Sequence, residues 1–88
     1  MSASMADRCV EDDVINLLSR SFSTRRQDIV RHSRLVEDLQ MDSVDVVEIA
    51  MMVDEVFAVE LSSDQVAGWR FVGDIVVSVL EAKALKRK

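Results

Sequence analysis

Residues 42–49 read Asp42-Ser43-Val44-Asp45-Val46-Val47-Glu48-Ile49, which places a hydroxyl at the start of an acidic amphipathic helix. Backbone N–H groups at a helix N-terminus point toward a bound anion, and the helix dipole favours negative charge there. A hydrolytic nucleophile would need a base and an oxyanion hole, yet no histidine and no Gly-x-Ser-x-Gly motif lies near Ser43 in the sequence. We therefore expect Ser43 to receive a group and not to attack a substrate. Serine and aspartate are also ordinary N-cap residues, so simple capping stays open at this point.

The composition of the chain indicates one small helical domain. Its 88 residues are too few for two domains. A hydrophobic content of 49% is enough for a core, and the absence of proline with only two glycines favours helices over a turn-rich β architecture. We expect a single domain over residues 1–88, with an ordered core at about 7–82.

Three features of the sequence indicate the cellular compartment of the protein. No apolar run approaches the roughly 20 residues that a membrane span needs, and the N-terminal residues lack the basic and apolar regions of a signal peptide. A single cysteine, Cys9, has no partner for an internal disulfide. These features predict a cytoplasmic protein without a membrane span.

Charge is distributed unevenly along the chain. Between Leu35 and Trp69 there is no lysine or arginine but there are nine carboxylates, although the net charge of the whole chain is only −5. Such a field repels nucleic acid and attracts basic protein surfaces. A merely solvated acidic face is the alternative. Because no cation interrupts 35 residues, we favour steering of protein partners and expect no nucleic-acid binding.

The first part of the chain predicts a helix followed by a long loop. Apolar residues recur at steps of three and four, which predicts a helix from about Asp7 to Ser21, capped by Ser4 or Asp7: Val10, Val14, Leu17, Leu18 and Phe22. Residues 23–42 are expected to be mostly irregular, with Ile29 and Leu35 as apolar anchors. The arginines of this loop lack the interleaved aromatics of a nucleic-acid site, and His32 lacks neighbours at ligand spacing. We therefore expect no metal site.

The second helix should run from about Ser43 to Phe57 and carry two unlike faces. The predicted core face comprises Val46, Val47, Ala50, Val53 and Phe57, and the outer face comprises Asp45, Glu48, Met52 and Glu55, flanked by Val44 and Met51. Apolar residues among exposed carboxylates are typical of a transient docking surface. Packing of Met51 and Met52 beneath neighbouring loops is an equally open interpretation.

Two further helices follow in the pattern. Residues 62–68 read as a capped, very short helix that ends at Gly68. Residues 71–80 have a β-branched run that would suit a strand, but their apolar positions also fit a helical stripe, and no second strand is available for pairing. We predict a helix there, with a basic tail from Lys83 to Lys88 that frays.

At this point the chain resembles the bacterial acyl carrier proteins. The resemblance is carried by residues 36–49, in which a loop leucine leads into Asp42-Ser43-Val44-Asp45 and an acidic helix, and it extends without an obvious gap from about Val10 to Leu80. It implies an all-α fold, a small four-helix bundle of acyl-carrier type with three longer helices and one short helix. It also implies that Ser43, flanked by Asp42 and Val44, is esterified by 4′-phosphopantetheine from coenzyme A.

The resemblance implies roles for further residues and partners. The docking face for partners would comprise Val44, Asp45, Glu48, Met51, Met52 and Glu55. The acyl cavity would be lined by Val47, Val53 and Trp69, although an indole packed in the core away from the cargo is equally open. The implied partners are a phosphopantetheinyl transferase and the acyl-loading, ketosynthase and other acyl-processing enzymes. The chain itself would be a monomeric carrier and not an enzyme.

Several positions depart from the family pattern. Gln40 stands where relatives usually have glycine, Val44 where they have leucine, and Trp69 where many have an aliphatic residue. None of these positions removes the attachment serine. They favour a specialised carrier that serves a secondary pathway over a housekeeping carrier for fatty-acid synthesis, although both fatty-acid and specialised lipid or polyketide synthesis stay open. The alternatives are a freestanding peptidyl carrier, against which the Asp-Ser-x-Asp motif argues, and an unmodified helical interaction module of the same fold.

Overall fold

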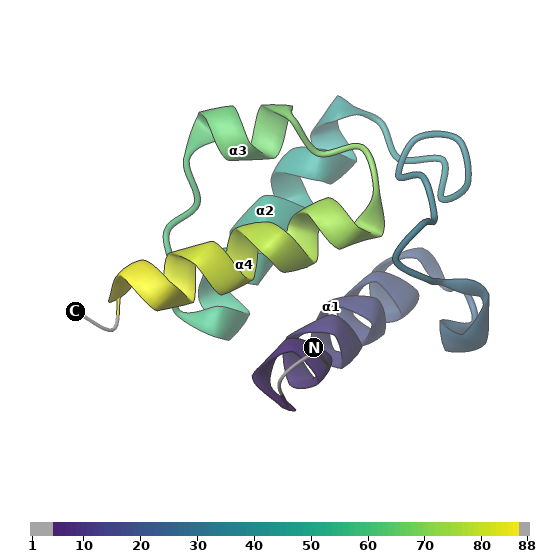
Figure 1. Ribbon diagram of the computed structural model, residues 1–88. Coiled ribbons are helices and arrows are strands. Elements are labelled where there is room, and N and C mark those ends of the chain that lie inside the picture. The colour runs from purple at the N-terminus through teal and green to yellow at the C-terminus, as the bar shows by residue number, and fades with distance from the viewer. Residues whose placement is uncertain (1–4, 87–88) are drawn as a thin grey trace.

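The computed structural model describes residues 5–86, with side chains described for residues 9–84. Its elements are α1 (Met5–Phe22), the 3₁₀ turn η1 (Arg26–Asp28), α2 (Ser43–Phe57), α3 (Ser63–Ala67) and α4 (Val72–Lys86). Figure 1 shows α1 and α4 in front, α2 behind α4, and the short α3 above them. The described residues contain no strand, and the predicted bundle of three longer helices and one short helix is confirmed.

α1 forms one wall of the core. Val10, Val14 and Leu18 of the predicted stripe are buried, and Leu17 and Phe22 pack against them half-buried. The helix begins before the predicted start, so Asp7 lies inside it and does not cap it, and the other predicted cap, Ser4, lies outside the described residues.

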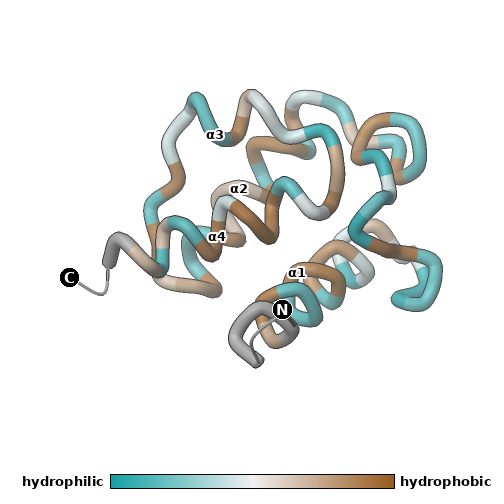
Figure 2. The backbone as a smooth tube through the Cα atoms, viewed as in Figure 1, coloured by the Kyte–Doolittle hydropathy of each residue, from teal (hydrophilic) through white to brown (hydrophobic). Residues whose placement is uncertain are grey.

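α4 forms the opposite wall of the core. Its β-branched residues Val72, Ile75, Val76 and Val79 have no solvent exposure, and each such fully buried side chain contributes about 1.5–3 kcal/mol. Figure 2 shows brown, hydrophobic segments along α4, with brown segments of α1 and α2 nearby. The prediction of a helix over residues 71–80 is therefore confirmed. The predicted fraying from Lys83 is not found as far as Lys86, where α4 ends, and the rest of the tail lies outside the described residues.

α2 has the predicted bounds but faces the core differently. Ile49 and Val53 are its buried residues, whereas Val47, predicted on the core face, is 53% exposed. The core therefore meets the helix along an i, i+4 pair on one side of the predicted stripe, and Val46, Ala50 and Phe57 flank that pair half-buried.

One residue of the predicted outer face of α2 also lies elsewhere. Met52 is half-buried and packs against the core. The end of α1 covers it, since Ser21 Oγ lies 4.0 Å from Met52 Sδ. Its placement on the exposed face is therefore wrong.

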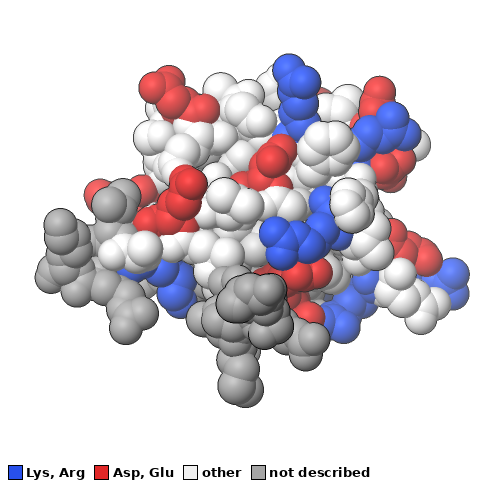
Figure 3. All heavy atoms as spheres, viewed as in Figure 1, with Lys and Arg blue, Asp and Glu red and all other residues white. Residues whose placement is uncertain are grey.

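The loop between α1 and α2 is tied down by arginine ion pairs. Arg25 pairs with Asp28, Arg26 with Asp12, Arg31 with Glu11, and Arg34 with both Glu37 and Asp38, at 2.8–3.5 Å. Figure 3 shows the result on one face, where blue and red groups lie next to each other on the side of this loop. Exposed pairs contribute little energy singly, but together they leave these four arginines engaged within the chain.

Asp38 closes the last turn before α2. The backbone N–H of Arg34 donates to Asp38 Oδ2 at 2.7 Å, and Arg34 Nε lies 3.5 Å from the same oxygen. These contacts hold the pKa of Asp38 below its ordinary value. Ile29 and Leu35, the predicted anchors of the loop, are buried.

The same loop is joined to the segment before α4. Leu35 N–H donates to the carbonyl of Arg70 at 2.9 Å, and Val72 N–H donates to the carbonyl of Ser33 at 3.0 Å. Gly73 N–H donates to the Arg31 carbonyl at 2.9 Å, and a Cβ at Gly73 would lie only 3.3 Å from that oxygen. The two segments are therefore held closely together.

Candidate functional site

The N-terminus of α2 is fixed by its own first turn. Asp42 is the N-cap: its Oδ1 accepts from Asp45 N–H at 3.0 Å, while Asp45 Oδ2 accepts from Asp42 N–H at 3.2 Å. This reciprocal capping box satisfies two backbone donors and orients the start of the helix. Both carboxylates that flank Ser43 are thus engaged in holding the backbone.

Ser43 is the first residue of α2 and is exposed. In the described part of the chain its hydroxyl makes no hydrogen bond, so no general base is poised against it. A hydroxyl that is accessible, free of internal partners and placed at a positive helix end suits attachment of an anionic group. The geometry gives no sign of a nucleophile activated for hydrolysis.

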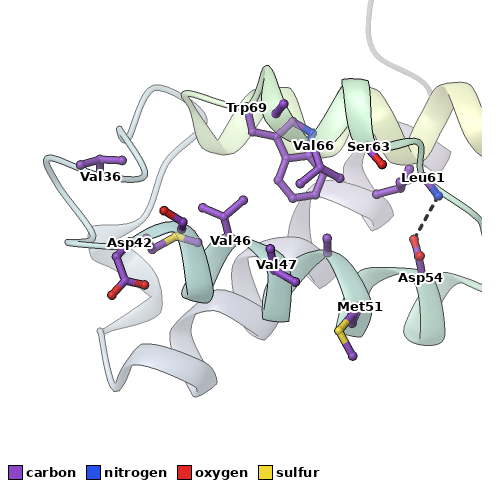
Figure 4. Close-up of a pocket in the computed structure, with 14 residues that line it drawn as sticks. Val36, Asp42, Val46, Val47, Met51, Asp54, Leu61, Ser63, Val66 and Trp69 are labelled. Atoms are coloured by element: carbon purple, nitrogen blue, oxygen red, sulfur yellow. Dashed lines mark hydrogen bonds between the residues drawn. The ribbon is translucent and has the colours of Figure 1, made fainter.

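A cavity of about 790 Å³ begins beside Ser43 and extends along α2. Figure 4 shows Val46 and Val47 on the α2 side and Val66 and Trp69 on the opposite side. Its lining residues are Val36, Met41, Asp42, Ser43, Val46, Val47, Ala50, Met51, Asp54, Leu61, Ser63, Val66, Ala67 and Trp69. Most of these side chains are apolar, so the cavity suits an apolar guest.

Asp54 marks the far end of this cavity. Its Oδ1 accepts from Leu61 N–H at 3.2 Å, a bond drawn as a dashed line in Figure 4. The bond joins the end of α2 to the segment that leads into α3. The cavity is therefore bounded at its two ends by the capped start of α2 and by this link.

Trp69 is oriented by a single buried hydrogen bond. Its Nε1–H donates to Ser78 Oγ at 2.9 Å, and the residue is 8% exposed. Since this bond uses the only polar group of the indole, the ring can present only carbon to the cavity. The residue thus packs in the core and lines the cavity at once.

The predicted cavity residues do not all lie at the cavity. Val47 and Trp69 line it, but Val53 has no exposure, lies in the core and is not among the lining residues. Sequence reasoning missed Leu61 and Val66. The apolar residue before the short helix and the valine within it were the available signal for them.

Only some of the predicted docking residues are exposed at the surface. Val44 and Met51 are 64% and 65% exposed, and Glu48 and Glu55 are exposed as well. Asp45 is half-buried in the capping box, and Met52 packs against the core. Val56, 59% exposed, adds an apolar residue that the sequence analysis did not single out.

The described residues contain neither a metal site nor a membrane-spanning helix. No group of three or more His, Cys, Asp or Glu residues there could hold a metal ion. No helix in the same part of the chain has the length and apolar character needed to cross a membrane.

Comparison with known proteins gives results consistent with this geometry. A family model described as a phosphopantetheine attachment site matches residues 12–77. The acyl carrier protein of Chlamydia trachomatis serovar L2 is 35% identical over 72 residues, covering 82% of this chain and 94% of that protein. The acyl carrier protein of Coprothermobacter proteolyticus is 36% identical over 61 residues, covering 69% and 74%.

A solved structure agrees at the level of the fold. The crystal structure of an acyl carrier protein from Thermotoga maritima superposes with a TM-score of 0.81 at 18% identity, covering 97% of this chain and 99% of the other. Sequence and structure therefore agree, and the chain belongs to the acyl carrier protein family, whose cofactor is covalently attached 4′-phosphopantetheine.

Proposed function

We propose that Ser43 is the residue esterified by 4′-phosphopantetheine and that the chain carries acyl groups for fatty-acid or specialised lipid or polyketide synthesis. The observation that carries this proposal is the exposed Ser43 hydroxyl, without an internal partner, at the capped start of α2 and at the edge of the cavity. When attached, the arm supplies a terminal thiol that holds an acyl group as a thioester.

The residues around Ser43 have distinct roles in this proposal. Asp42 and Asp45 hold the first turn of α2 so that its free N–H groups and the helix dipole face the phosphodiester. Val44, next to Ser43 and 64% exposed, offers apolar contact to the enzyme that attaches the group. The chain performs no bond chemistry itself.

The cavity along α2 is proposed to shelter the acyl chain. Val47 and Trp69 line it on opposite sides. The indole occupies volume that an aliphatic residue would leave free, so we propose that this carrier favours short acyl groups or groups held partly outside.

The exposed part of α2 is proposed to receive the partner enzymes. Glu48 and Glu55 steer basic surfaces, and Val44 and Met51 add apolar contact once the surfaces meet. The partners are a phosphopantetheinyl transferase, acyl-loading enzymes and a ketosynthase, each of which binds briefly because a carrier must be released. We propose a monomer in the reducing cytoplasm, where the free thiol of Cys9 would persist.

The two alternatives predict different modification states. A peptidyl carrier would take the same arm but accept aminoacyl groups. An unmodified interaction module would keep Ser43 as a free hydroxyl. No contact of the described residues favours either alternative over an acyl carrier.

The test is intact mass after incubation with coenzyme A and a broad-specificity phosphopantetheinyl transferase. The wild-type chain should gain one phosphopantetheine, and Ser43→Ala should gain none. Ser63→Ala is the matched control, because Ser63 is also exposed, begins α3 and lines the same cavity. It should be modified like the wild type. An unmodified wild type, or a modified Ser43→Ala, would refute the assignment.

A further inference from the structure

A second hollow shares Val36 with the cavity along α2. Its volume is about 360 Å³, and it is lined by Arg34, Val36, Glu37, Arg70 and Phe71. Val36, which is 64% exposed, lines both hollows. The second hollow therefore adjoins the mouth of the cavity that holds Ser43.

The charge of this hollow differs from that of α2. Arg34 is neutralised by Glu37 at 2.8 Å and by Asp38 at 3.5 Å. The guanidinium of Arg70, in contrast, has no hydrogen bond or ion pair within the described residues. Beside it Phe71 is 40% exposed. The hollow thus offers one guanidinium without an ion pair next to an aromatic and an aliphatic surface.

The backbone that carries these side chains is held on both sides. Leu35 N–H donates to the Arg70 carbonyl at 2.9 Å, and Asp74 Oδ2 accepts from the N–H groups of Arg70 and Phe71 at 2.8 and 3.0 Å. Because the backbone is already ordered here, binding costs the entropy of these two side chains but no entropy of loop ordering. Arginine and aromatic residues are also enriched where protein interfaces gain most of their energy.

We propose that the hollow at Arg70 and Phe71 is a second docking point for the acyl-processing enzymes, one that takes a carboxylate flanked by an apolar side chain on the enzyme. The inference rests on the proposed carrier function. The carboxylate pairs with the Arg70 guanidinium, and the apolar side chain packs on Phe71 and Val36. Together with acidic α2, the carrier then presents two contacts of opposite charge, which fix its rotation on the enzyme.

The test measures the ketosynthase of the same organism with the acyl-loaded carrier as its varied substrate. Intact mass first establishes that each variant carries the arm and the acyl group, and circular dichroism establishes that it is folded. Arg70→Glu should raise the KM for the carrier roughly tenfold with kcat unchanged, because a charge-assisted contact becomes a repulsion. Arg70→Gln should raise the KM by a smaller factor.

Arg20→Glu is the matched control. Arg20, on α1, also lacks a hydrogen bond or ion pair within the described residues, and it lines a different hollow with Leu17, Ser21 and Met52. The two charge reversals alter the net charge equally, and a more negative carrier should bind a basic partner more tightly. Opposite responses of KM, higher for Arg70→Glu and equal or lower for Arg20→Glu, would support the second docking point.

Equal responses of the two variants, or an unchanged KM for a loaded Arg70→Glu, would overturn this inference and leave the carrier function intact. A wild type that never gains the arm would instead refute the carrier function itself. The two failures are therefore distinguishable.

Discussion

Gln40 is a non-glycine residue that adopts a backbone conformation usually reserved for glycine. It precedes the buried Met41 and has a φ of 58°, in the left-handed region that favours glycine. This position is where the family resemblance implies glycine. A side chain there costs about 1 kcal/mol, and the hydrogen bond from Met41 N–H to the Leu35 carbonyl at 3.0 Å helps to hold the turn.

Replacing Gln40 by glycine should therefore stabilise the protein. We expect Gln40→Gly to lower the free energy of the folded state by about 1 kcal/mol relative to the unfolded state, which raises Tm by roughly 4–8 °C in a domain of this size. Gln27→Gly is the control, since Gln27 lies in η1 without a positive φ, and it should lower Tm. Thermal unfolding measures both, and a lower Tm for Gln40→Gly would contradict the strain argument.

Trp69 permits a test of which acyl chain lengths the cavity accepts. If the indole limits the cavity, its fluorescence emission should shift as the carrier is loaded with successively longer acyl chains. Trp69→Leu should then accept longer chains, at some loss of stability because Ser78 Oγ loses the buried Nε1–H donor. Emission that stays constant at every chain length would mean that the indole serves only the core.

The side chains of α2 face three different environments. Ile49 and Val53 face the core, Val46 and Val47 line the cavity, and Glu48 and Glu55 remain exposed, while Met51 is exposed and also lines the cavity. The helical period predicts that such faces exist, but it does not determine how they are rotated relative to the rest of the bundle. Val47 was misplaced for that reason: a valine suits the core and the cavity wall equally well.

Reversing one exposed charge on this helix should slow docking while leaving the helix folded. Glu48→Lys should reduce kcat/KM of the transferase several-fold at low ionic strength and flatten its salt dependence, because steering is lost. Glu60→Lys is the control, since Glu60 is exposed but lies after α2 has ended. Rates that equal those of the wild type at low ionic strength would remove steering by α2 from the proposal.

For the molecule as a whole, the sequence predicted the elements better than their contacts. Helix periodicity and capping signals located α2 and α3, and the motif around Ser43 indicated a candidate attachment serine, which the structure leaves exposed. The partial burial of Met52 against the end of α1 involves a contact 31 residues away in the sequence. The pairing of the loop arginines with α1 carboxylates is also long-range. Local patterns do not contain such information, because they describe neighbours along the chain only.

The hydrogen bonds between residues 33–35 and 70–72 have a mechanical consequence for the whole carrier. They make one flank of the cavity stiff, since the loop before α2 and the segment before α4 are fastened to each other. α3, in contrast, has five residues, none of them buried, and forms the compliant flank. If the cavity shelters the acyl chain as proposed, we expect a guest that outgrows it to displace α3 and to leave the stiff flank in place. The length of a hidden cargo would then be converted into a movement on the surface of the carrier.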